Sequence, residues 1–195
     1  MTTHSAHARL VVKAVTPARW ADMDVLFSAR GSPKHCWCMA WRANQKTPGA
    51  DSGPGRKKLM KACVDDGIPV GLLGYLDGQP VAWCSLAPFD SFVGLRKPDD
   101  AEDTRKVWSV TCFFVRREHR GQGLTRQLLA AAVDHARQHG ARLIEGYAVD
   151  PDSPSYRHMG FVTLFKHAGF SEVAREGTRR HVMQRSLAPS RSAKR

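Results

Sequence analysis

The residues with the clearest chemical signal are arginines and glycines that separate an apolar run at residues 107–115 from a helical pattern at 124–139. At such a junction the first four N–H groups of the helix lack partners, and the helix dipole presents positive charge. Gly121 and Gly123 let the backbone approach a ligand without an intervening Cβ atom. The positive side chains nearby are Arg116, Arg117, Arg120 and Arg126. We therefore predict a site for a phosphate or pyrophosphate, with a plain tight turn as the alternative.

This junction lacks the patterns of two common nucleotide sites. A P-loop requires a lysine followed by serine or threonine, and a dinucleotide fold requires a third glycine and a downstream acidic residue. Neither pattern accompanies the glycines at 121 and 123. The sequence therefore disfavours ATP and NAD as the ligand.

The elements that hold the junction are a strand, a helix and a second strand. Residues 107–115 are rich in β-formers, and a second such run follows the helix at 141–149. One stripe of the helix is apolar and consists of Leu124, Leu128, Ala132 and Ala136. Because a crossover helix joins parallel strands, we predict a parallel β-α-β unit at the centre of the fold.

The flanking segments predict antiparallel strands and further helices. Two apolar runs around Asp77-Gly78 indicate a hairpin. Other strands are expected at 9–15, 171–176 and 179–187, and other helices at 17–30, 55–67 and 160–169. The predicted fold class is α/β, with a mixed, mostly antiparallel sheet of about six to seven strands, the central parallel unit and helices on both faces.

The composition is that of one globular domain. The chain has 195 residues, 42% of them hydrophobic, and no long linker divides it. We expect a flexible N-terminus at 1–8, a single domain at 9–187 and a disordered basic tail at 188–195. Because no signal-like or membrane-spanning apolar run occurs and the five cysteines are odd in number, we expect a cytoplasmic protein with reduced thiols.

The charge is strongly positive. The chain carries 30 Lys and Arg against 18 Asp and Glu, a formal net charge of +12. Such a field attracts RNA, an acidic protein or a polyanionic cofactor alike. The charge therefore predicts an anionic partner without identifying it.

The stretch FFVRREHRGQGLTRQLL resembles the signature of the GNAT superfamily of acyl-CoA-dependent N-acyltransferases, with the match running from Val115 through Gly123. The hairpin GYLDGQPVAWCSL is similar to the second and third strands of that superfamily, and LFKHAGFSEV to the end of its last helix. Together these similarities cover roughly residues 9–187. The chain is identified on this basis as a member of the superfamily.

The resemblance implies a binding mode for acetyl-CoA, with no metal. The pyrophosphate would rest on the amides at 121–126, and the pantetheine would run along residues 113–115 like an added strand. A backbone N–H near Phe113 would hold the thioester carbonyl. The implied cofactor-binding residues are Phe113, Phe114, Val115, Arg120, Gly121, Gln122, Gly123, Leu124, Thr125 and Arg126.

The chain departs from the superfamily pattern at three positions. Thr125 replaces the usual last glycine or alanine, and its hydroxyl can donate to a phosphate. Arg117 replaces a frequent proline. Phe165 stands where many members carry the tyrosine that protonates the leaving CoA thiolate. The third departure puts the source of that proton in doubt.

Acetyl transfer needs a neutral amine, an oxyanion donor and a proton source. Glu145 and Asp150 are the candidate bases, with Asp150 favoured because it follows the strand, although it is also typical of a turn. Tyr147 and Tyr156 are candidate acids or packing tyrosines, and a solvent proton also suffices for a thiolate. Ser109 and Cys112 are interpreted as packing residues, so the predicted catalytic residues are Asp150, Glu145 and Tyr156.

The segment HCWCMAWR at residues 35–42 is a second unusual pattern. His35, Cys36 and Cys38 include ligands that zinc prefers, but the second Cys/His pair of a structural site is missing. In the superfamily this part of the chain borders the acceptor pocket, which implies an acceptor-binding role for Trp37, Met39 and Trp41. The alternative is an aromatic plug that packs this loop on the sheet.

The leading hypothesis is an acetyl-CoA-dependent N-acetyltransferase in which the primary amine of a small molecule attacks the thioester directly. The alternatives are transfer to a macromolecular amine, on a protein or an aminoacyl-tRNA, and a non-catalytic acetyl-CoA sensor. We expect no membrane partner and leave nucleic acid and a homodimer open as partners.

Overall fold

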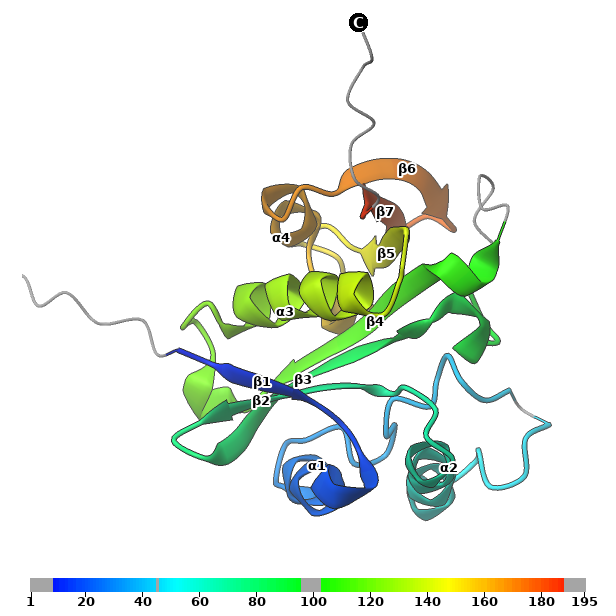
Figure 1. The fold of residues 1–195 in the computed structure, drawn as a ribbon, viewed down its shortest axis with the longest axis vertical. Coiled ribbons are helices and arrows are strands. Elements are labelled where there is room, and N and C mark those ends of the chain that lie inside the picture. Colours follow the sequence, from blue (N-terminus) through cyan, green and yellow to red (C-terminus); the bar gives the residue numbers. More distant parts are fainter. Residues whose placement is uncertain (1–8, 45, 96–102, 188–195) are drawn as a thin grey trace, which may run out of the picture.

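Seven strands form one mixed sheet in the structure, a computed structural model that describes residues 9–44, 46–95 and 103–187 (Figure 1). Their order across the sheet is β1-β2-β3-β4-β5-β7-β6. The strands are β1 (Val11–Ala14), β2 (Gly71–Leu76), β3 (Gln79–Pro88), β4 (Val107–Val115), β5 (Leu143–Ala148), β6 (Ser171–Glu176) and β7 (Arg180–Ser186). Only β4 and β5 pair in parallel among these neighbours. The predicted α/β fold with a mostly antiparallel sheet is confirmed.

Helices cover both faces of the sheet. α1 (Trp20–Ser28) and α2 (Gly53–Asp65) lie on one face, and α3 (Leu124–Gln138) and α4 (Val162–His167) lie on the other (Figure 1). The short 3-10 helices are Pro17–Arg19, Phe89–Ser91, Thr104–Lys106, Arg117–His119 and Arg157–Met159. The flexible N-terminus predicted at 1–8 and the basic tail predicted at 188–195 lie outside the described residues.

Local sequence signals account for most element boundaries. The hairpin turns at Asp77 and Gly78, whose φ angles of 47° and 77° suit a primed turn. α2 begins two residues earlier than predicted because Ser52 caps it by accepting from the N–H of Gly55. α1 ends at Ser28 rather than at residue 30 because Ala29 is extended.

The two larger apolar cores lie on the two faces of the sheet. On one face, α3 contributes Leu128, Leu129 and Ala132, and α4 contributes Phe165. On the other face, residues from α1 and α2 pack with Trp83 and with the segment that contains Trp37. The sheet is thus buried on both faces, and its central strands are held rigidly between two layers.

The sheet opens between its two parallel strands. β4 pairs with β5 only from Val107 opposite Leu143 to Val110 opposite Gly146. The register of β4 with β3 shifts at Ser85/Leu86, which leaves Thr111 as an extra residue in β4. Within the described chain, the part of β4 beyond Val110 therefore has no partner in β5, and this opening leads toward the arginine and glycine junction.

Candidate functional site

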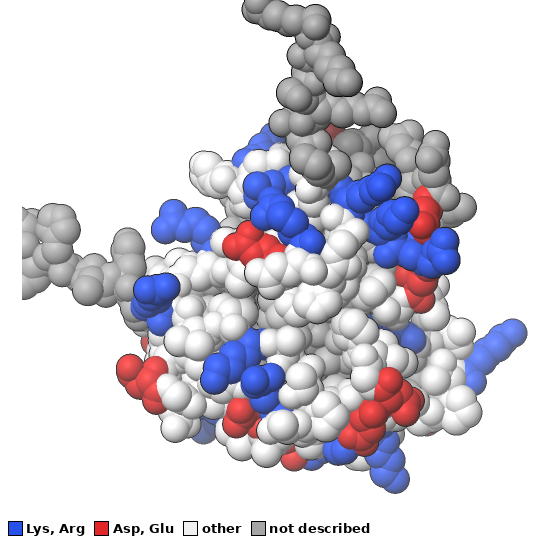
Figure 2. Space-filling model, viewed as in Figure 1, with Lys and Arg blue, Asp and Glu red and all other residues white. Residues whose placement is uncertain are grey.

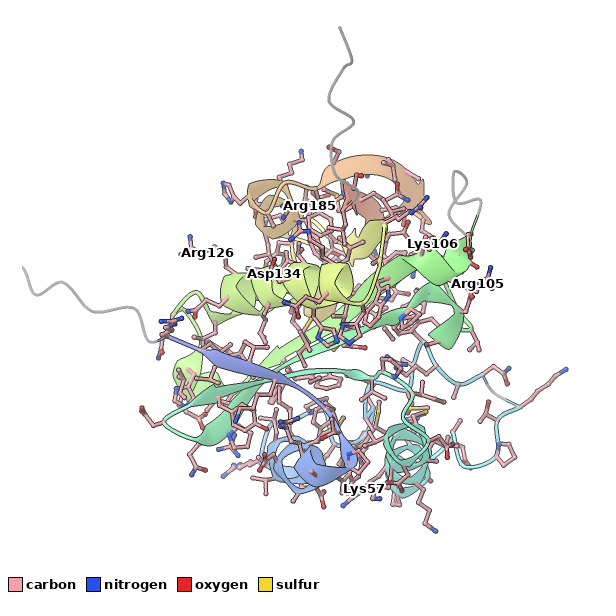
Figure 3. The ribbon with its side chains drawn as sticks, viewed as in Figure 1. Lys57, Arg105, Lys106, Arg126, Asp134 and Arg185 are labelled. Atoms are coloured by element: carbon pink, nitrogen blue, oxygen red, sulfur yellow. The ribbon has the colours of Figure 1, made fainter. Side chains whose placement is uncertain are left out.

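The junction after β4 has the conformation that an anion site requires. Gly121 and Gly123 have φ angles of 77° and 73°, in the left-handed region that favours glycine. Gly123 is the N-cap residue of α3, and among the described residues no side chain caps this helix. Arg126 projects from this end of α3 (Figure 3). The first N–H groups of the helix are therefore available to a ligand.

A groove of about 740 Å³ lies beside this junction. Its lining consists of Ala29, Arg30, Gly31, Phe114, Arg116, Arg117, Glu118 and Arg120. Four of these residues are arginines and one is acidic, so the groove favours a polyanion. The Arg120 Nε donates to the carbonyl oxygen of Val115 at 3.0 Å, which holds this arginine at the end of β4.

Sequence reasoning named Phe114, Arg116, Arg117 and Arg120 for this site but missed the lining residues Ala29, Arg30 and Gly31. Arg30 and Gly31 follow α1, far from the junction in sequence. They reach the groove because Ala29 is extended and Gly31 has a φ angle of 76°. The only sequence signal is Gly31, the glycine directly after the helix predicted at 17–30.

Phe165 lies at the opening between β4 and β5. Its side chain is fully buried and its ring centroid is 6.3 Å from that of Phe113 on β4. On the β5 side, a Cβ atom at Gly146 would collide with the ring of Phe165. The ring therefore packs against both strands where they separate, and it has no hydroxyl to donate.

Glu145 is a buried carboxylate on the opposite side of β5. Its residue is 1% exposed, and it accepts hydrogen bonds from the Tyr147 hydroxyl and, at 2.6 Å, from the Gln184 amide. Burial and the neighbouring carboxylate of Glu145 raise the pKa of Tyr147 well above its usual range. Tyr147 therefore keeps its proton and orients Glu145.

Asp150 lies just after β5 and is engaged differently. Its side chain is 54% exposed, and one carboxylate oxygen is 3.1 Å from Nε2 of the buried His181. The other ring nitrogen of His181 is 2.9 Å from Glu172, and this contact lowers the pKa of Glu172. Because His181 and Val182 alternate along β7, Asp150 and Glu145 lie on opposite faces of the sheet.

Tyr156 lies on the loop after β5 and is 38% exposed. Its backbone is left-handed, with a φ angle of 59°, and its ring centroid is 5.2 Å from the guanidinium carbon of Arg180. Trp41 approaches the same guanidinium carbon, at 4.7 Å. Tyr156 and Trp41 thus flank Arg180.

The three predicted acceptor residues fall in two environments. Trp37 and Met39 are buried in the core beside α1, where Trp37 stacks on Phe27 at 5.1 Å. Their placement agrees with the aromatic-plug alternative. Trp41 instead packs against a separate group that contains Tyr147, the residue whose hydroxyl donates to Glu145.

The part of the chain that the structure describes shows no metal site and no membrane span. It has no group of three or more His, Cys, Asp or Glu side chains arranged to hold a metal ion. Within the same ranges, no helix has the length and apolar character needed to cross a bilayer.

Comparison with known proteins identifies a family. A model described as the Acetyltransferase (GNAT) family matches residues 37–161. Among curated proteins, none is significantly similar in sequence.

Solved structures share the fold at low sequence identity. The protein yncA from Salmonella typhimurium, solved with its cofactor acetyl-CoA, is 19% identical, with a TM-score of 0.56 over 93% of this chain and 95% of that one. The GNAT family N-acetyltransferase YhbS from Escherichia coli, in complex with CoA, is 19% identical, with a TM-score of 0.56 over 96% and 86%. The Escherichia coli ribosomal-protein-S18-alanine N-acetyltransferase is 11% identical, with a TM-score of 0.55 over 96% and 99%.

Proposed function

The chain belongs to the GNAT acetyltransferase family, and from this premise we propose that it moves an acetyl group from acetyl-CoA to a primary amine of a small molecule. One observation carries the proposal: the opening between β4 and β5 leads to a groove with four arginines and to the glycine-rich start of α3. Acetyl-CoA has an extended arm that ends in phosphates, so the arm would suit the opening and the phosphates would suit the groove and the start of α3.

Acetyl-CoA supplies an acyl group on a thioester, and this chain has the groups to hold it. The amides at 121–126 and the neighbouring arginines would bind the phosphates. The unpaired edge of β4 around Phe113 would bind the extended arm and offer an N–H to the thioester carbonyl. The groove adds Arg30 to the predicted cofactor-binding residues.

Glu145 is the base that the geometry supports best. Two hydrogen-bond donors hold its carboxylate, and its position in β5 is next to the opening. It would take the proton of the acceptor ammonium directly or through one water molecule. Asp150, which the sequence favoured, is less suited because it contacts His181 on the opposite face.

The proton for the leaving thiolate has no evident side-chain donor among the described residues. Phe165 lacks a hydroxyl, and the Tyr147 hydroxyl is bonded to Glu145. Tyr156 lies against Arg180. Because a thiolate is a good leaving group, we propose that solvent supplies this proton.

The net charge of +12 favours a second candidate, a macromolecular acceptor such as a protein amine or a charged tRNA. On the face seen in Figure 2, however, Lys and Arg side chains lie in small groups among uncharged surface and carboxylates. RNA binding that persists without residues 188–195 and weakens steeply with salt would support this candidate. An RNA affinity that does not change with salt concentration would count against a tRNA acceptor.

The first experiment measures acetyl-CoA binding by calorimetry and CoA release in the presence of a panel of small amines. Micromolar binding with turnover on a small amine is expected. Failure to bind acetyl-CoA would overturn the proposal. Binding without turnover on any small amine would favour the macromolecular acceptor or a non-catalytic sensor.

A further inference from the structure

Arg180, the first residue of β7, lies between two aromatic rings. Its guanidinium carbon is 4.7 Å from the ring centroid of Trp41 and 5.2 Å from that of Tyr156, and its side chain is 14% exposed. The two rings come from the segment between α1 and α2 and from the loop after β5. Because the space between the rings already holds a cation, they position Arg180 and do not form an open cage for a substrate ammonium.

The hydrogen-bonding capacity of this group is not used up. Arg180 Nη2 lies 3.1 Å from Glu176 Oε1. Within the described residues, Arg180 Nη1 and Trp41 Nε1 are buried donors without a partner, and Glu176 Oε2 is a buried acceptor without one. Each buried unpaired group costs about 1–3 kcal/mol, so such groups in native proteins call for an explanation, such as an ordered water, an ion or a bound ligand. Two unpaired donors, one of them cationic, suit an oxyanion.

These donors lie on the same face of the sheet as the base. Trp41 packs against Tyr147, Met159 and Val182, and Tyr147 donates to Glu145. In β7, Arg180 is two residues from Val182, so both side chains point to this face. An acceptor along this face would place one end at Arg180 and extend its amine toward Glu145, which pairs with Gln184, four residues or about 13 Å further along β7.

We propose that Arg180 and Trp41 bind a carboxylate of the acceptor, so that the preferred substrates are extended amines in which several bonds separate the amine from an acidic group. This inference rests on the proposed function, because it assumes that the amine reacts on the Glu145 face. It predicts that polyamines and aminoglycosides, which lack the acidic group, are poor substrates.

The test compares substrates that differ only in the carboxylate. Acetyl transfer is measured for a series of ω-amino acids that varies the distance from amine to carboxylate, and for the amide of each acid. A phosphonate analogue in place of the carboxylate tests whether any oxyanion suffices. In the wild-type protein the acid is expected to exceed the amide at least about tenfold in kcat/KM, the effect of one charge-assisted hydrogen bond.

Variants connect this preference to the two donors. Arg180→Gln should abolish the preference, whereas Arg180→Lys, which keeps the charge without the fork, should retain part of it. Trp41→Phe keeps a ring and removes the N–H, and should raise KM a few-fold for the acid only. The matched control is Arg179→Gln, because Arg179 is the exposed neighbour and donates to Ser155 at 3.0 Å.

A binding measurement separates this inference from the proposed function. In the presence of CoA, the N-acetylated acid should bind more tightly than the N-acetylated amide, and Arg180→Gln should remove the difference. Equal rates for acid and amide, or a preference unchanged by Arg180→Gln in a folded variant, would overturn the inference while leaving the proposed function standing. If no amine is acetylated, the proposed function fails, and the binding comparison still supports or overturns the carboxylate site.

Discussion

The proposed cofactor end and the proposed acceptor end of this sheet are assembled in different ways. The cofactor end is built mainly from one continuous stretch, in which β4 runs through a glycine turn into α3. The acceptor end combines Trp41, Glu145 and Arg180 from three separate segments. The cofactor end is formed by backbone geometry, whereas the acceptor end is formed by side-chain contacts between distant segments. The acceptor end can therefore change its specificity without disturbing the fold or the cofactor.

The largest expected effect belongs to the base. Glu145→Gln keeps the size of the side chain but removes its ability to take a proton, so kcat/KM should fall about 100-fold. The affinity for acetyl-CoA, measured by calorimetry, should be unchanged because Glu145 lies outside the groove.

The comparison variant is Asp150→Asn, at the other carboxylate. It should lower kcat/KM less, because Asp150 contacts His181 on the opposite face. A larger loss in Asp150→Asn than in Glu145→Gln would reverse the assignment and restore the preference given by the sequence.

The next effect concerns the backbone at the cofactor end. Gly123→Ala should weaken acetyl-CoA binding about tenfold, because the new methyl group occupies the side from which phosphates approach the amides. Gly140→Ala is a matched control at the other end of α3, since both glycines have left-handed φ angles, 73° and 79°, and open surroundings.

Both alanine variants should lose about 1–2 kcal/mol of unfolding free energy from backbone strain. Only Gly123→Ala should lose affinity for acetyl-CoA. Equal affinities in the two variants would show that the start of α3 does not contact the phosphates.

A smaller effect is expected where the two ends meet, at Phe165. Phe165→Tyr buries a hydroxyl and should lower the unfolding free energy of the free protein by about 1–2 kcal/mol. Phe170→Tyr, at a buried ring 5.2 Å away, should cost a similar amount. Thermal unfolding measured with and without acetyl-CoA then distinguishes the two variants. Acetyl-CoA should recover part of the loss only in Phe165→Tyr, whose hydroxyl lies at the opening. Equal recovery would mean that residue 165 does not approach the cofactor.

Local signals explain why the cofactor end could be predicted from the sequence. The turn at Asp77-Gly78, the apolar stripe of α3 and the two glycines before it each depend on neighbours in sequence. The fold class and the position of the junction follow from these features. The extended Ala29 that brings Arg30 to the groove leaves no such signal.

Prediction of the acceptor end depended on the register between strands, which no short sequence motif encodes. Alternation in β7 places Arg180, Val182 and Gln184 on one face. The two polar members of this set, Arg180 and Gln184, were a signal of a polar site that the sequence pattern contained. Their pairing with Glu145 and Trp41 required the strand order β5-β7-β6. Likewise, the left-handed φ angles of Trp37 and Cys38, 47° and 49°, belong to a segment that buries Trp37 beside α1 and packs Trp41 against the group that contains Tyr147.

The smallest effect tests whether the two ends of α3 have separate roles. Near its C-terminal end, burial and the neighbouring His139 lower the pKa of His135 from its usual range to about 4. The unfolded chain therefore binds a proton at His135 below about pH 6.5, where the folded protein still excludes it. Stability is complete above that pH and is lost as the pH falls toward 4.

After allowance for partial solvent exposure, this loss should be about 1 kcal/mol, measured as the fall in unfolding free energy from pH 7 to pH 5. His135→Gln should reduce the fall, whereas His167→Gln, at an exposed position in α4, should leave it unchanged. Neither variant should alter acetyl-CoA affinity at pH 7, because the proposed cofactor contacts lie at the N-terminal end of α3. A loss of affinity in His135→Gln would show that the two ends are coupled, and the cofactor end could then no longer be regarded as local backbone geometry.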